Sequence, residues 1–179
     1  MKHTIVINLF GGPSIGKSTA AADLFTRLKM LGVDAELAPE YMKELIWDER
    51  VTTFDDQLYI TAKQNRRIMR LIGKVDVAIT DSPIPLGAIY ARRRNDPNAD
   101  LFDQLFHNIF ITNRNINIVL PRIHKHVDNG RIHGEDESIS IDQDIERWLT
   151  ERNQSYMKMD TYSEMDEVVK CIVGLLSQS

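Results

Sequence analysis

The sequence predicts an α/β protein in which a five-stranded parallel sheet carries helices on both faces. Short apolar runs rich in β-branched residues alternate with longer stretches whose apolar residues have helical spacing. Such alternation is typical of parallel sheets, because consecutive parallel strands need a crossover connection, usually a helix. The chain has 179 residues and no repeat or Pro-, Gly- or Ser-rich linker, so we expect one domain spanning residues 1–179.

The predicted elements follow from the apolar pattern and from the turn residues between the runs. Strands are expected at residues 4–9, 35–38, 75–80, 116–120 and 156–159. Helices are expected at residues 17–31, 40–50, 54–72, 100–112, 141–153 and 164–176. Gly32 and Gly73 directly follow two of these helices, as is common at helix ends. The polar stretch 121–138 contains glycine and histidine and is predicted to be a long mobile loop that acts as a lid.

Composition and charge narrow the class of protein. Hydrophobic residues make up 42% of the chain and charged residues 27%, which is ordinary for a soluble globular protein. No apolar run approaches the roughly 20 residues of a membrane span, so we expect a cytoplasmic protein. The lone cysteine, Cys171, has apolar neighbours and is expected to be a packed thiol. The net charge of −4 argues against a dedicated nucleic-acid binder.

The segment 11–18, Gly-Gly-Pro-Ser-Ile-Gly-Lys-Ser, matches the pattern G-x-x-x-x-G-K-[ST] between a predicted strand and a predicted helix. Glycine lets such a loop curl so that backbone N–H groups converge on phosphate oxygens at a helix N-terminus. The sequence therefore predicts ATP, or less readily GTP, with Lys17 on the β- and γ-phosphates, Ser18 on Mg²⁺ and Thr19 near the α-phosphate. The alternative is a glycine-rich turn with an exposed lysine. The predicted nucleotide-binding residues are Gly11, Gly12, Pro13, Ser14, Ile15, Gly16, Lys17, Ser18 and Thr19.

Two acidic residues follow predicted strands and so belong to the ligand-binding edge of a doubly wound sheet. Asp81 follows the strand at 75–80 and is predicted to meet Mg²⁺, although it could instead cap the next helix. Glu40 follows the strand at 35–38 and could accept the proton of an acceptor hydroxyl. Its plain alternative is a first-turn glutamate that stabilises a helix dipole.

The predicted lid carries arginines that could stabilise a transferring phosphoryl group. Arg122 follows the strand at 116–120, and Arg131 lies in the middle of the loop. The alternative is a surface loop with incidental arginines. The loop also holds three histidines, which could bind zinc but lack a standard ligand spacing and are more simply solvated or near the adenine: His124, His126 and His133.

A second set of side chains could bind the phosphoryl acceptor. Gln57, Gln64 and Arg67 fall on the helix predicted at 54–72, where glutamine could read a base edge and arginine a phosphate. Arg92 belongs to a run of three arginines before a turn, and it could also bind substrate phosphate. A solvated helix face and a polar loop end are the equally reasonable alternatives.

With these motifs placed, the chain resembles the small P-loop kinases related to nucleoside monophosphate kinases. It looks most like the NadR-like, ribosylnicotinamide-kinase-type group, whose members are often labelled AAA-family ATPases in bacteriophage genomes. That resemblance implies a sheet of order 2-3-1-4-5, a lid, ATP with Mg²⁺, and Glu40 in the place of the base of related deoxynucleoside kinases. It rests on residues 7–19, 38–41, 57–59, 63–64, 73–76, 79–83 and 122–131.

Three functions are therefore compatible with the sequence. The leading one is a Mg²⁺- and ATP-dependent kinase, a phosphotransferase acting on a nucleoside, nucleotide or nucleoside-like acceptor, as a monomer or homodimer. In it, Lys17, Arg122 and Arg131 stabilise the phosphoryl group and Glu40 activates the acceptor. The second is a kinase acting on hydroxymethylated pyrimidines in phage DNA, which the arginine clusters motivate. The third is a nucleotide-dependent ATPase or switch that transfers phosphate only to water.

Overall fold

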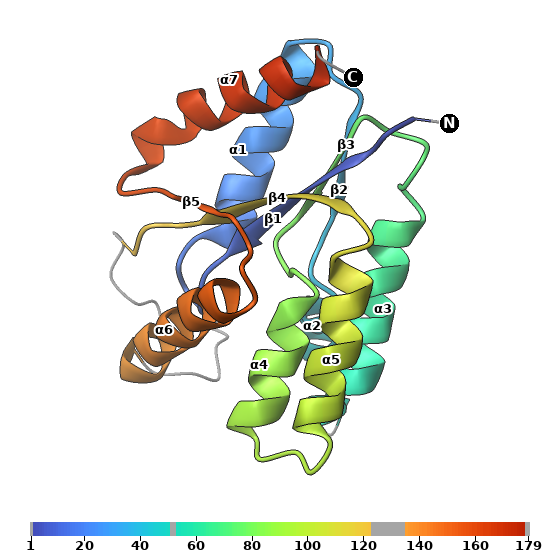
Figure 1. The fold of residues 1–179 in the computed structure, drawn as a ribbon, viewed down its shortest axis with the longest axis vertical. Coiled ribbons are helices and arrows are strands. Elements are labelled where there is room, and N and C mark those ends of the chain that lie inside the picture. Colours follow the sequence, from blue (N-terminus) through green and yellow to red (C-terminus); the bar gives the residue numbers. More distant parts are fainter. Residues whose placement is uncertain (1, 51–52, 123–134, 178–179) are drawn as a thin grey trace.

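The computed structural model describes residues 2–50, 53–122 and 135–177 and contains a five-stranded sheet (Figure 1). Its strand order is β2-β3-β1-β4-β5, and every neighbouring pair is parallel. Both the predicted class and the predicted order 2-3-1-4-5 are confirmed. The strands are β1 (Ile5–Phe10), β2 (Ala35–Ala38), β3 (Val77–Thr80), β4 (Arg114–Val119) and β5 (Met157–Lys158).

The central strand β1 is buried on both faces, which explains its unbroken apolar sequence. Side chains alternate along a strand. Ile5 and Ile7 therefore join the core on one face of the sheet, while Val6 and Phe10 join the core on the other. This double burial fixes β1 in the middle of the molecule, with its carboxyl end pointing into the functional region.

Two helical layers cover the sheet (Figure 1). Helices α1 (Lys17–Met30) and α7 (Met165–Leu176) pack on the first face. The second face is covered by α3 (Gln57–Met69), α4 (Pro85–Arg93), α5 (Ala99–Phe110) and α6 (Glu135–Glu151). The short α2 (Met42–Trp47) follows β2, and a 3₁₀ turn, η2 (Tyr162–Glu164), precedes α7.

Helix α4 is absent from the prediction, which has no regular element between residues 81 and 99. Pro85 and Gly87 look like helix breakers in sequence. In the structure Pro85 occupies the first turn, where its missing N–H costs no intrahelical hydrogen bond. Gly87 lies where Thr61 and Phe106 approach closely, so its lack of a side chain serves helix packing. Arg92 therefore lies in the last turn of a helix and not in a loop.

Several predicted boundaries were also wrong. Helix α2 is shorter than predicted residues 40–50, because Glu49 takes a left-handed backbone conformation (φ 55°) directly after it. Helix α6 begins at Glu135, earlier than predicted residue 141. The prediction that Cys171 is a packed thiol was wrong, because Cys171 is exposed on α7 while Val168 and Ile172 face the core. Among the described residues, no helix is long and apolar enough to cross a lipid bilayer.

Candidate active site

The loop between β1 and α1 has the curled geometry predicted for a phosphate-binding loop. Gly16 takes a left-handed conformation (φ 95°) immediately before α1. A Cβ atom at Gly16 would lie 2.3 Å from the Tyr162 hydroxyl, which donates a hydrogen bond to the Ile15 carbonyl over 2.7 Å. Glycine is therefore required both by the backbone and by the tyrosine that supports the loop from η2.

Lys17 places a positive charge inside this loop. Its Nζ atom donates hydrogen bonds to the carbonyls of Gly11 (2.7 Å) and Gly12 (2.8 Å). Burial lowers the pKa of Lys17, and the nearby carboxylates of Glu40 and Asp81 oppose that shift only in part. The Ser14 hydroxyl is buried and, within the described chain, has no hydrogen-bond partner. Phosphate oxygens would accept a hydrogen bond from the Ser14 hydroxyl and would balance the charge of Lys17. Both features fit the predicted binding of a nucleotide.

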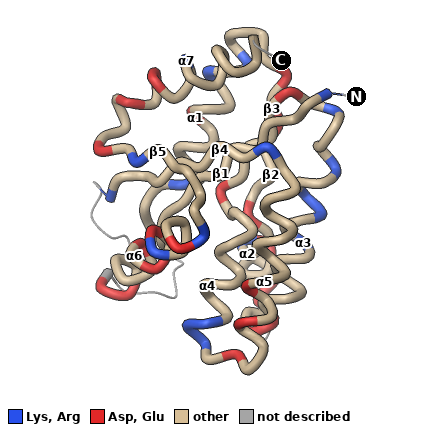
Figure 2. The backbone as a smooth tube through the Cα atoms, viewed as in Figure 1, with Lys and Arg blue, Asp and Glu red and all other residues tan. Residues whose placement is uncertain are grey.

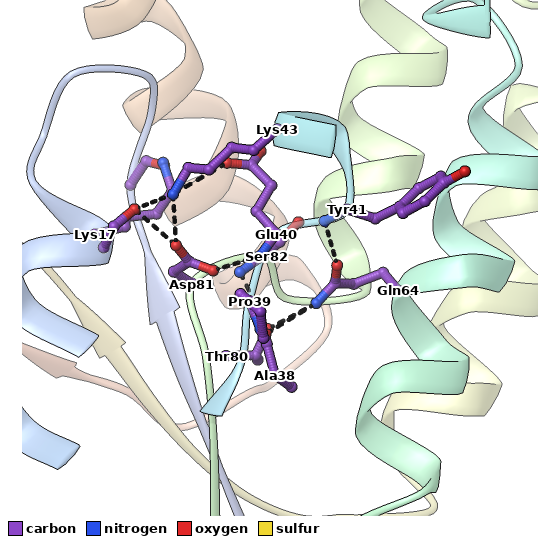
Figure 3. Close-up of polar contacts among 12 residues, drawn as sticks. Lys17, Ala38, Pro39, Glu40, Tyr41, Lys43, Gln64, Thr80, Asp81 and Ser82 are labelled. Carbon is purple, nitrogen blue, oxygen red and sulfur yellow. Dashed lines mark hydrogen bonds and ion pairs between the residues drawn. The ribbon is translucent and has the colours of Figure 1, made fainter. Parts of the chain in front are cut away.

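Asp81 lies at the carboxyl end of β3, beside the loop, and only 4% of it is exposed. Its Oδ2 accepts a hydrogen bond from the Ser18 hydroxyl (2.7 Å), and its Oδ1 accepts one from the Glu40 backbone N–H (2.8 Å). The Lys43 ammonium lies 3.0 Å from Oδ2 (Figure 3). The alternative role of Asp81 as a helix cap is not observed, because α4 begins without a side-chain cap.

Ser18 and Asp81 together form a donor set suited to Mg²⁺. Both present oxygen atoms, which Mg²⁺ prefers, and both contact one cation, the ammonium of Lys43. The ammonium thus stands in for a metal ion at the place where the sequence predicts one. Within the described ranges no group of three or more His, Cys, Asp or Glu is arranged to hold a metal ion, so any Mg²⁺ here would take its remaining ligands from water and phosphate.

A cavity of about 260 Å³ adjoins the loop. Glu40 lines it, and 29% of the Glu40 side chain is exposed. Residues 13–19 form one part of the wall, and a more apolar part is formed by Met42, Ile46, Phe54, Gln57, Tyr90 and Arg94. Burial raises the pKa of the Tyr90 hydroxyl, so this group stays neutral over the physiological range. The cavity therefore joins a phosphate-binding region to a space that could hold an organic acceptor beside a carboxylate.

Arg122 follows β4 and fastens the loop to α6. Its Nε donates to Asp142 Oδ2 (2.7 Å), and its terminal nitrogens donate to the carbonyls of Pro13 (3.1 Å) and Ser138 (3.4 Å). The second oxygen of Asp142 accepts the Gly12 N–H over 2.5 Å. Arg131 and the three loop histidines, His124, His126 and His133, lie outside the described residues, so their predicted roles stay predictions.

The family model of an AAA domain matches residues 6–164, which include the whole site and all of the strands except Ile5 of β1. The chain belongs to this family. No curated protein matches the chain significantly. The AAA domain nevertheless has many structural relatives, and those described next share its overall fold.

The solved structures similar to this AAA domain include kinases of nucleosides and nucleotides. A NadR protein in complex with NR has a TM-score of 0.76 at 17% identity, over 99% of this chain but 52% of that one. The chain thus spans about half the length of that protein. A thymidylate kinase from Ehrlichia chaffeensis has a TM-score of 0.65 at 16% identity, over 97% and 98% of the two chains. A deoxyadenosine kinase from M. mycoides has a TM-score of 0.61 at 18% identity, over 97% and 100%. The chain therefore has a kinase-like P-loop fold.

Of the two glutamines predicted to bind the acceptor, one lines the cavity of this AAA domain and the other is hydrogen-bonded inside the protein. Gln57 lines the cavity, although its amide donates to the Phe54 carbonyl (2.8 Å). The Gln64 amide is used inside the protein: it accepts the Tyr41 N–H (2.9 Å) and donates toward Ala38 and Thr80 (Figure 3). This amide holds the backbone that carries Glu40.

The two predicted acceptor arginines also have partners within the AAA domain. Arg67 donates to the Pro39 carbonyl (2.9 Å) and forms an ion pair with Glu44. Arg92 pairs with Asp100 (2.9 Å) and Asp103 (3.4 Å) on α5. It lines a second cavity between α4, α5 and α6, away from the phosphate-binding loop. Arg94, two residues further on, lines the first cavity in its place.

Three residues that the structure brings to the site were not predicted from the sequence: Lys43, Tyr90 and Asp142. Lys43 could have been found, because it lies three residues after Glu40 in the helix predicted at 40–50, where side chains at that spacing are neighbours. Tyr90 could not, because α4 was not predicted. Asp142 contacts the loop across 130 positions of sequence, which no local pattern shows.

Proposed function

We propose that the chain is an ATP- and Mg²⁺-dependent kinase that transfers the γ-phosphoryl group to a hydroxyl of a nucleoside, nucleotide or nucleoside-like acceptor. The observation that carries the proposal is that Lys17 of the phosphate-binding loop and Glu40 line the same cavity. The apolar wall beyond Glu40 is suited to a planar ring. The similarity in fold to kinases of nucleosides and nucleotides supports the same reading.

In the proposed reaction the acceptor oxygen attacks the γ-phosphorus, the bond from that phosphorus to the β-phosphate oxygen breaks, and ADP leaves. Glu40 takes the proton of the attacking hydroxyl. Lys17 neutralises charge on the phosphate oxygens, and the loop N–H groups hold the nucleotide in line. Ser18 and Asp81 would hold Mg²⁺, which supplies charge neutralisation on the β- and γ-phosphates. Arg122 and Arg131 are proposed to add positive charge as the lid closes.

The arginines that motivate the DNA-kinase alternative differ in whether they are engaged within the chain. Arg67, Arg92 and Arg93 are each paired with an aspartate or glutamate of the same chain, whereas Arg66 and Arg70 are exposed and form no ion pair with the described residues. Phosphate contacts to DNA need cations that are available to the partner. A small acceptor is favoured by the cavity beside Glu40, and modified DNA is kept as a comparison substrate in the test.

The decisive experiment measures ADP release over a panel of nucleosides, nucleoside monophosphates, nicotinamide riboside and DNA with hydroxymethylated pyrimidines. A kinase releases ADP only in proportion to a suitable acceptor, and the phosphorylated product appears in mass spectra. Steady ATP hydrolysis that no acceptor changes would favour the ATPase or switch. Activity with the modified DNA alone would show that the acceptor is a polynucleotide and not a small molecule.

Glu40→Gln tests the role of the carboxylate once an acceptor is known. The amide cannot accept the hydroxyl proton, so kcat should fall by about 10²–10⁴-fold while the Kd for ATP stays nearly unchanged. Glu36→Gln is the matched control, because Glu36 is exposed on β2 and outside the cavity lining. Full activity of Glu40→Gln would show that another group takes the proton.

A further inference from the structure

Lys43 lies in the first turn of α2, and its ammonium sits among oxygens of the predicted metal site. It donates a short hydrogen bond to the Ser18 hydroxyl and lies 3.0 Å from Asp81 Oδ2. Glu40 Oε2 lies 4.0 Å away. Figure 3 shows the lysine reaching back across Glu40 toward Asp81. The side chain thus joins Ser18 of the first turn of α1 to Asp81 after β3 and Glu40 after β2.

This arrangement provides a counter-charge for a buried carboxylate. The Asp81 carboxylate is buried, and a buried charge needs a partner of opposite sign. Lys17 does not fill that role, because its ammonium is turned toward the carbonyls of Gly11 and Gly12. Lys43 supplies the direct cationic contact to Asp81 in the described structure.

The same contact is incompatible with a metal ion on the same oxygens. Two cations close together in a partly buried site repel one another strongly. The Lys43 side chain is 43% exposed and flexible, so it can swing away without disturbing the core. Removal of the ammonium would leave Ser18 and Asp81 free for a divalent ion.

We propose that Lys43 is an internal counter-ion that occupies the metal site of the nucleotide-free protein and must leave before Mg²⁺ binds. The metal then enters together with ATP, because the phosphates give both cations new partners. The inference rests on the proposed nucleotide and Mg²⁺ site, and it says how metal binding at that site is controlled. It makes Lys43 a residue that couples metal binding to nucleotide binding.

The test measures Mn²⁺ binding to the nucleotide-free full chain by the loss of the free-ion electron paramagnetic resonance signal. Mn²⁺ shares the oxygen preference of Mg²⁺ and is visible to this method. Lys43→Met should bind Mn²⁺ at least about tenfold more tightly than wild type, because the competing charge is gone. Lys29→Met is the matched control: Lys29 is exposed near the far end of α1, and its loss changes net charge equally.

The proposal predicts tighter binding in Lys43→Met alone. Equal Mn²⁺ affinity in wild type and Lys43→Met overturns it, as does absence of binding in both. An equal gain in Lys29→Met would also overturn it, because net charge would then explain the effect. Circular dichroism establishes that the variants are folded. The measurement uses neither ATP nor an acceptor, so failure of the proposed kinase activity appears separately, in the ADP-release panel.

Discussion

The protonation of Lys17 should depend on whether ATP is bound. Its ammonium is surrounded by protein and contacts two carbonyls, and burial lowers its pKa below the ordinary lysine value. Phosphate oxygens would add negative charge beside it and stabilise the protonated form. The pKa of Lys17 should therefore rise when ATP binds.

ATP binding should consequently take up protons at alkaline pH. Well below the lowered pKa, Lys17 is protonated in both states and no proton moves. Between that lowered pKa and the ordinary value of about 10.4, binding should take up as much as about one proton per ATP. Titration calorimetry in two buffers of different ionisation enthalpy measures this number. Lys17→Arg should show no uptake, because a guanidinium stays protonated throughout; the same uptake in both proteins would assign the proton elsewhere.

The residues that could be predicted are those whose role is encoded locally. Lys17 and Ser18 follow from the spacing of the glycine motif, and Glu40 and Asp81 follow from their positions directly after apolar strands. Lys43 and Asp142 could not be assigned in this way. Their contacts depend on how α2 and α6 are oriented, which the packing of the whole molecule decides.

At the scale of elements, α3, α4 and α5 form a tightly packed group on one face of the sheet. Gly87 of α4 lies at a close approach of these helices. A Cβ atom there would lie 2.0 Å from Thr61 Oγ1 and 3.1 Å from a ring atom of Phe106. The helices can approach this closely because glycine has no side chain. The same approach positions Tyr90, one turn further along α4, in the wall of the cavity.

Gly87→Ala should therefore destabilise the protein. The added methyl group overpacks the contact with Thr61 and Phe106, and we expect a loss of about 1–3 kcal/mol in the free energy of unfolding. Urea denaturation followed by circular dichroism measures the change. Gly174→Ala is the matched control, because Gly174 lies in α7 and nothing lies within 4 Å of its added Cβ. That control should gain about 0.5–1 kcal/mol from helix propensity, and a loss of similar size in both would refute the packing argument.

On the scale of the whole molecule, the strand order brings distant parts of the sequence to one edge. The carboxyl ends of β1, β2 and β3 supply the phosphate-binding loop, Glu40 and Asp81. The end of β4 leads to Arg122, and the segment after β5 supplies Tyr162, which supports the loop. Charged residues of both signs are spread over the rest of the chain (Figure 2). A ligand held at this edge touches several elements at once and should stabilise the whole fold.

Thermal unfolding tests this coupling between ligand and fold. ATP with Mg²⁺ at about 100 times its Kd should add about 2.7 kcal/mol to the free energy of unfolding. For a chain of this length, that corresponds to a rise in Tm of about 5–11 °C. Chelation of the metal with EDTA should reduce the shift, because Ser18 and Asp81 then lose their link to the phosphates. An unchanged Tm with Mg·ATP, or an identical shift in EDTA, would contradict the predicted metal-assisted site.

The sequence by itself determined the α/β class, the strand–helix alternation and the phosphate-binding loop. These features depend on apolar periodicity and on a contiguous motif, both of which are local. Tertiary structure alone decided that Pro85–Arg93 is a helix, that Cys171 is exposed, and that Lys43 meets Asp81. The physical reason is that burial and charge pairing depend on which surfaces the sheet brings together, often across more than a hundred positions of sequence.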